Sequence, residues 1–174
     1  MLPAGLIMAH AGGVTFNRGY ALDPGHALED LDMGDGSVLS LKVTGRQSRG
    51  LVTVLEGVVR SGGPPLHVHE AEDEVIIVLE GQLDYQVGNE RGELAAGGVL
   101  WFPRQVPHAV ANLTGKPCRF ITVITPSGIE DFFRGQRDYL ATLAPDSPPD
   151  PAGFAAVPGA EQRPAVGPPL APRS

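Results

Sequence analysis

Residues 63–81, GPPLHVHEAEDEVIIVLEG, carry the strongest structural pattern in the chain. His67 and His69 are two residues apart, so on a strand their side chains project from the same face. The polar residues 70–73 that follow are short enough for the chain to reverse direction. Glu74 then opens an apolar run that returns beside the histidines. The stretch therefore predicts two adjacent strands with two imidazoles and one carboxylate directed at a common point.

A third histidine, His108, lies further along the chain in a similar setting. It follows the rigid Pro103 and Pro107 and precedes the alternating residues 109–112, which predict a strand. We expect His108 to be the fourth member of the group formed by His67, His69 and Glu74.

Short runs of β-branched and aromatic residues recur from about residue 37 to 126, each closed by Gly, Pro or Asn. The predicted strands are 38–43, 51–59, 75–81, 83–87, 99–103, 108–113 and 120–125. Turn signals lie between them at residues 62–65, 88–92 and 96–98. Seven short strands without intervening helices favour a β-sandwich or a small barrel over a parallel α/β sheet.

These residues resemble the two sequence motifs of the cupin superfamily. The first motif is matched from the first histidine onward by His67, His69, Glu74 and Gly81, although Gly62 and Gly63 lie nearer the histidines than the usual Gly. The second is matched by Gly97, Pro103, His108 and Asn112. Gln105 stands where the family usually has Gly, so a turn that needs positive φ would be strained there.

The resemblance covers roughly residues 40–135 and is strongest to small single-barrel cupins grouped with quercetin dioxygenases. It implies an all-β fold, the cupin double-stranded β-helix or jelly-roll barrel. We expect the barrel and a C-terminal helix in residues 37–144, because Ser127 and Glu130 have capping-box spacing and the following residues have an apolar face. Residues 1–36 are predicted as an N-terminal extension that supplies an extra strand or a dimer contact. The Pro-, Ala- and Gly-rich residues 145–174 are predicted as an extended tail.

Three neutral imidazoles and one carboxylate form a ligand set for one divalent transition metal, with two octahedral positions left open. The set suits Fe, Mn, Ni, Cu, Co or Zn, and the sequence does not select among them. The resemblance implies a quercetin 2,3-dioxygenase-like oxygenase that uses dioxygen and in which Glu74 also serves as a base. Two alternatives stay open. The first is a metal-dependent cyclase, isomerase or lyase, and the second is a non-enzymatic barrel that binds a small molecule.

Strand parity and residue size predict the pocket for a small, aromatic or enolisable substrate. Ile76 and Val78 share the face of Glu74, and Val110 and Asn112 share the face of His108. The large residues able to complete the pocket, each of which also suits an ordinary core, are Tyr85, Trp101, Phe102, Phe120 and Phe132. The acidic run Glu70, Glu72 and Asp73 is interpreted as a solvated turn.

Composition excludes several other functions. The net charge of -7, with scattered Lys and Arg, argues against a nucleic-acid partner. No apolar run approaches the roughly 20 residues of a membrane helix, and the N-terminus lacks the basic residues of a secretion signal, so we expect a cytoplasmic protein. The single Cys118 is expected to be a buried thiol. A homodimer is expected because the exposed edges of a β-sandwich need covering.

Overall fold

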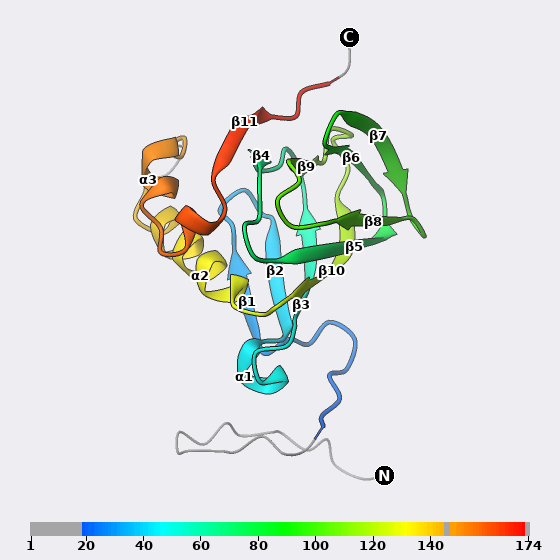
Figure 1. The fold of residues 1–174 in the computed structure, drawn as a ribbon. Helices are drawn as coiled ribbons and strands as arrows, with labels where there is room; N and C mark the ends of the chain where they lie inside the picture. The colour runs from blue at the N-terminus through cyan, green and yellow to red at the C-terminus, as the bar shows by residue number, and fades with distance from the viewer. Residues whose placement is uncertain (1–18, 145–146, 173–174) are drawn as a thin grey trace.

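Two antiparallel β-sheets form the body of the computed structural model, which describes residues 19–144 and 147–172 (Figure 1). The first sheet contains, in spatial order, β1 (Glu29–Asp32), β2 (Val38–Val43), β3 (Thr53–Val59), β10 (Cys118–Thr125), β5 (Asp73–Glu80) and β8 (Val99–Phe102). The second contains β11 (Ala165–Pro169), β4 (Pro65–His67), β9 (His108–Ala111), β6 (Gln82–Val87) and β7 (Glu90–Ala95). The expectation of an all-β jelly-roll barrel is confirmed.

Alternating apolar residues of both sheets meet in the barrel interior. The main buried cluster consists of Ile76, Val78, Leu83, Leu100, Phe102, Cys118 and Phe120. In β5 and β8 every second residue of the run from Ile76 to Val78 and from Leu100 to Phe102 is buried, as expected for strands with one face on a core. Cys118 is a buried free thiol, as its apolar neighbours predict.

All seven strands that the apolar runs predict are present, and the structure adds strands at the sheet edges. At least half of the residues of β1 and β7 are charged, EDLD and ERGELA, and among the described strands each pairs on one side only. Because an edge strand buries little surface, charged side chains suit it and no apolar alternation marks it in the sequence. The segment predicted as a turn at residues 88–92 is a two-residue turn, Gly88 and Asn89, followed directly by β7.

The predicted C-terminal helix is α2 (Ile129–Leu140), which lies beside β1 (Figure 1). Its N-cap residue is Gly128 rather than Ser127, and no side chain caps it. Glu130 is buried and ties the helix to the barrel instead: its carboxylate accepts hydrogen bonds from the backbone N–H groups of Gly45 and Gly128 and from the Thr53 hydroxyl. Among the described residues, no helix is long and apolar enough to cross a membrane.

The Pro-rich segment folds back onto the barrel, which corrects the expectation of an extended tail. It contains α3 (Pro151–Ala155), the 3-10 turn η1 (Ala160–Gln162) and β11. β11 pairs with β4, the strand of His67, and lies at the outer edge of the second sheet (Figure 1). A strand that contains prolines is tolerated there because only one of its sides joins a ladder. The short helix α1 (Gly45–Ser48) completes the elements.

Candidate metal centre

Three histidines meet where β4 and β9 lie side by side. His67 ends β4, His69 follows two residues later, and His108 begins β9, where it is the direct register partner of His67. Their ligand atoms all lie within 4.8 Å of one another. The Nε2 atoms of His67 and His69 are 3.2 Å apart. The structure therefore brings together the three histidines that the sequence predicts to share a site.

Backbone carbonyls set the tautomers of two of these rings. His67 Nδ1 donates to the Pro65 carbonyl at 2.8 Å, and His108 Nδ1 donates to the Val106 carbonyl at 2.9 Å. A carbonyl oxygen only accepts, so Nδ1 must carry the proton in both rings. Each Nε2 is then left with a free lone pair, which is the form in which imidazole binds a metal.

Glu74 also faces the histidines. Its Oε2 lies 3.6 Å from His108 Nε2 and 3.9 Å from His69 Nδ1. Two atoms that each lie about 2.1 Å from one ion are separated by about 3 to 4.2 Å, depending on the angle between them. The 3.2 Å separation of the His67 and His69 nitrogens and the 3.6 Å separation of the Glu74 and His108 atoms both fall in this range.

Burial keeps two of the rings neutral. Desolvation is the largest cause that lowers the pKa of His69, to about 2, and the neighbouring His67 lowers it further. Desolvation also lowers the pKa of His67, with a further contribution from His108. His108 Nε2 is buried and has no hydrogen-bond partner among the described residues. A buried group of bare nitrogens and one carboxylate oxygen fits a divalent cation, which would satisfy all of them at once.

Gln105 adopts the left-handed conformation that the motif normally assigns to Gly. Its φ is 63°, and its backbone N–H donates to the His69 carbonyl at 2.8 Å. The turn before His108 is therefore kept although its residue has a Cβ. The hydrogen bond links this turn to the stretch that carries the other two histidines.

Six of the nine predicted pocket residues lie in the barrel interior. Ile76, Val78, Phe102 and Phe120 belong to the main buried cluster, and Tyr85 and Val110 pack against it. The strand parity that placed Ile76 and Val78 on the face of Glu74 agrees with their burial.

Trp101, Asn112 and Phe132 lie elsewhere. Trp101 is 53% exposed, because the buried residues of β8 are its neighbours Leu100 and Phe102. Asn112 is buried, but its amide donates to the Val59 and Lys116 carbonyls at 2.8 and 2.6 Å and so holds a loop. Phe132 lines a separate pocket beside α2.

Phe102 lies next to the histidines, and its ring stacks on His108 with centroids 4.5 Å apart and planes at 11°. Size suggested both Trp101 and Phe102 as pocket residues, and of the two only Phe102 has the parity that points inward. The residues that sequence reasoning missed are Glu72 and Arg163. Glu72 is 4% exposed and paired with Arg163, which is 8% exposed, so the interpretation of Glu72 as part of a solvated turn is wrong.

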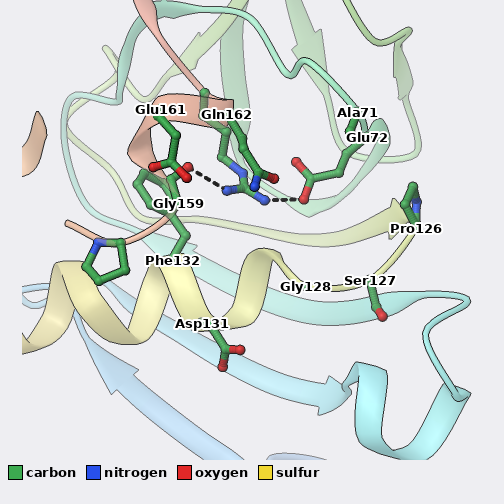
Figure 2. Close-up of a pocket in the computed structure, with 12 residues that line it drawn as sticks. Ala71, Glu72, Pro126, Ser127, Gly128, Asp131, Phe132, Gly159, Glu161 and Gln162 are labelled. Carbon is green, nitrogen blue, oxygen red and sulfur yellow. Dashed lines mark hydrogen bonds and ion pairs between the residues drawn. The ribbon is translucent and has the colours of Figure 1, made fainter.

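The Glu72–Arg163 pair lies in a pocket of about 360 Å³ between the barrel, α2 and the C-terminal segment (Figure 2). Figure 2 shows Glu72 directed toward the guanidinium, with Phe132 and Gly159 on the other side of the pocket. Arg163 lies over the Phe132 ring at 5.1 Å and donates to the Gly159 carbonyl at 2.9 Å. Glu72 Oε2 also lies 3.9 Å from His69 Nδ1.

Comparisons with known proteins agree with the fold and the motifs. The family model described as the cupin domain matches residues 50–124. An uncharacterized protein of Methanocaldococcus jannaschii is 27% identical over 94 residues, which are 53% of this chain and 75% of that protein.

Two solved structures are similar in fold. KdgF from Halomonas sp. is 17% identical with a TM-score of 0.55, over 65% of this chain and 97% of that one. An RmlC-like cupin from Shewanella frigidimarina is 19% identical with a TM-score of 0.52, over 64% of this chain and 96% of that one. At these identities the structures bear on the fold alone. The family match, the jelly-roll sheets and the clustered histidines together identify residues 50–124 as a small domain of the cupin superfamily.

Proposed function

We propose that this cupin is a mononuclear metal enzyme that oxygenates a small aromatic or enolisable substrate. His67, His69, His108 and Glu74 would hold one divalent transition metal. The observation that carries the proposal is the convergence of three imidazoles and one carboxylate at an apolar barrel interior. When bound, the metal would supply a Lewis acid and positions for substrate oxygen and dioxygen.

The character of the interior supports this substrate class. The main buried cluster contains aliphatic and aromatic side chains and the Cys118 thiol, and one of its members, Phe102, stacks on His108. Such a lining favours a planar, weakly polar molecule over a sugar phosphate or a dicarboxylate, whose charges would lose hydration without a basic partner. Tyr85 and Val110, both half-buried and packed against the cluster, are the residues best placed to contact it.

Glu74 is proposed as both a ligand and a proton acceptor. Its carboxylate oxygen lies 3.6 Å from His108 Nε2 and 3.9 Å from His69 Nδ1, within the histidine group. A carboxylate in this place is able to take the proton of a bound substrate hydroxyl.

An aerobic and anaerobic substrate screen tests the reaction class. Protein purified without chelators is analysed for metal and then incubated with phenolic and enolisable compounds while oxygen consumption and products are followed. We expect product formation to stop without oxygen and to match oxygen consumed. If turnover is equally fast without oxygen, the reaction is not an oxygenation and belongs to the isomerase, cyclase or lyase class. If a small molecule binds tightly and is never converted, the protein is a non-enzymatic binding barrel.

The Glu74→Gln variant tests the base role. We expect turnover to fall much more than metal content, because the amide can still coordinate through oxygen but cannot accept the proton. Glu70→Gln is the matched control, since Glu70 is exposed and lies in the same segment. A fully metallated Glu74→Gln protein with wild-type turnover on every active substrate would contradict the base role.

We also propose that two copies associate through the outer face of β8. Val99 and Trp101 are 59% and 53% exposed on this strand, and among the described strands β8 pairs only with β5, at the end of the first sheet. Their register partners on β5, Ile77 and Val75, continue the apolar face. A second copy related by a two-fold axis would cover both the edge and this face.

Light scattering after size-exclusion chromatography tests the association. Wild-type protein is expected as a dimer and Trp101→Glu as a monomer. Leu51→Glu, at a residue that is 72% exposed elsewhere, is the control and is expected to stay dimeric. A monomeric wild type, or a dimer that Trp101→Glu leaves intact, would argue against this face.

A further inference from the structure

Unsatisfied polar atoms gather between the metal centre and the C-terminal segment. Among the described residues, buried side-chain atoms without a hydrogen-bond partner include His69 Nδ1, Glu72 Oε2, His108 Nε2 and Arg163 Nε. A bound metal ion would satisfy His108 Nε2. His69 Nδ1 and Glu72 Oε2 lie 3.9 Å apart, so a movement of about 1 Å toward each other would form a hydrogen bond that satisfies both atoms.

Arg163 holds Glu72 in the orientation that this contact needs. The Arg163 guanidinium binds Glu72 Oε1, which leaves Oε2 as the oxygen that faces His69. The backbone supports the pair, because Glu70 N donates to the Gln162 carbonyl at 2.9 Å and Val68 N donates to the Pro164 carbonyl at 3.2 Å. The C-terminal segment is thus hydrogen-bonded along the same stretch that carries His69.

Glu74 is the other carboxylate at 3.9 Å from His69 Nδ1, but its position differs. Its Oε2 also lies 3.6 Å from His108 Nε2 and therefore toward the centre of the histidine group. Arg163 binds Glu72 Oε1, and among the described residues Glu72 Oε2 has no hydrogen-bond partner. Both carboxylates lie at the same distance from His69 Nδ1, but only Glu72 is held there by Arg163.

We propose that Glu72 is a positioning residue that accepts the Nδ1 proton of His69, and that Arg163 from the C-terminal segment fixes Glu72 for this role. The proposal rests on the metal site proposed above. It gives His69 the same tautomer that backbone carbonyls give His67 and His108, so that all three rings present Nε2. Such an outer carboxylate orients the ring and raises its basicity, and its loss typically weakens metal binding 10–100-fold.

Cobalt binding to full-length, chelator-treated protein tests the proposal. Affinity for Co²⁺ is measured by chelator competition, and the visible absorption of bound Co²⁺ reports the ligand geometry. We expect Glu72→Gln to bind Co²⁺ about 10–100-fold more weakly than wild type and to shift the visible band. Glu130→Gln is the control, because Glu130 is equally buried but bonds only groups away from the histidines. It is expected to lose stability while its Co²⁺ affinity stays within about twofold of wild type.

The double variant Glu72→Gln with Arg163→Met separates positioning from a purely structural ion pair. It leaves no unpaired buried charge, so it should fold even where a single variant does not. We expect its Co²⁺ affinity to remain reduced like that of Glu72→Gln. Wild-type affinity and spectrum in the double variant would overturn the positioning role while leaving the metal site intact. A wild-type protein that binds no Co²⁺ would overturn the metal site itself and the positioning role with it.

Discussion

Gln105 is a residue whose backbone conformation costs stability. Its φ of 63° crowds the Cβ, whereas Gly adopts the same conformation freely. We expect Gln105→Gly to raise the free energy of unfolding by about 0.5–1 kcal/mol, after the greater freedom of Gly in the unfolded chain is deducted. Urea denaturation measures this change. Gln105→Ala keeps the Cβ and should bring no gain, and an equal gain from Ala would contradict the strain.

His69 makes the stability of the metal-free protein depend on pH. Burial lowers its pKa to about 2, so the folded state does not take up the proton that the unfolded chain binds near pH 6.5. The contribution of His69 to the free energy of unfolding is complete above pH 6.5 and is lost as the pH falls toward 2. Between pH 7.5 and 5.5 this loss is about 1.4 kcal/mol.

Urea denaturation of wild type and His69→Gln in the presence of a chelator isolates this contribution. The free energy of unfolding should fall between pH 7.5 and 5.5 by about 1.4 kcal/mol less in His69→Gln than in wild type. The comparison is needed because burial raises the pKa of Glu72, which acts in the opposite direction. Equal drops in the two proteins would show that His69 titrates normally.

The ligand residues were predictable because their chemistry depends on spacing along strands. His67, His69 and Glu74 are close in sequence, and strand geometry alone directs them to one point. Glu72 was not predictable in the same way, since an acidic run looks the same whether its members are solvated or paired. Its partner Arg163 is 91 residues away in a segment without an apolar pattern.

The junction of β4 and β9 depends on a glycine that no larger residue can replace. A Cβ on Gly63 would lie 1.9 Å from the Val110 carbonyl oxygen and 2.9 Å from the Ala111 Cα. Both atoms are backbone of β9, so the strand that carries His108 would have to move. We expect Gly63→Ala to lower the free energy of unfolding by about 1–3 kcal/mol and to weaken Co²⁺ binding.

Chemical denaturation and cobalt titration check both effects. Gly19→Ala is the matched control, because a Cβ there would meet nothing within 4 Å. Wild-type stability in Gly63→Ala would mean that the two strands separate more easily than their packing indicates.

Elements with a buried face were predictable, and elements at the edges were not. The run at residues 120–125 alternates buried and partly exposed residues in β10, which lies between β3 and β5. β7 and β11 pair on one side only, so their sequences need neither alternation nor a donor at every residue. The cap of α2 was predicted at the wrong residue because Glu130 bonds across to Gly45 and Thr53, contacts that local spacing does not reveal.

At the scale of the whole molecule, metal binding should stabilise the fold. Three of the four proposed ligands lie on β4, β5 and β9, and His69 follows β4; since these strands belong to both sheets, one ion would link the two layers. At a free Co²⁺ concentration of 100 times Kd, the gain is about 2.7 kcal/mol, which corresponds to a rise in Tm of about 5–10 °C for a chain of this size.

Thermal denaturation with and without Co²⁺, followed by circular dichroism, measures this rise. His108→Ala should abolish it, whereas His26→Ala should keep it because His26 is exposed and outside the cluster. The same rise in both variants would place the bound metal somewhere other than the three histidines.

The return of the C-terminal segment to β4 has a consequence for biosynthesis. The ribosome makes β4 long before β11, so a nascent chain that has already folded its other strands still displays an open edge beside His67. Until the last strand emerges, His69 lacks the cover of Arg163 and Glu72 lacks its counter-charge. The imidazoles are therefore easier for an ion to reach before β11 has paired with β4 than afterwards.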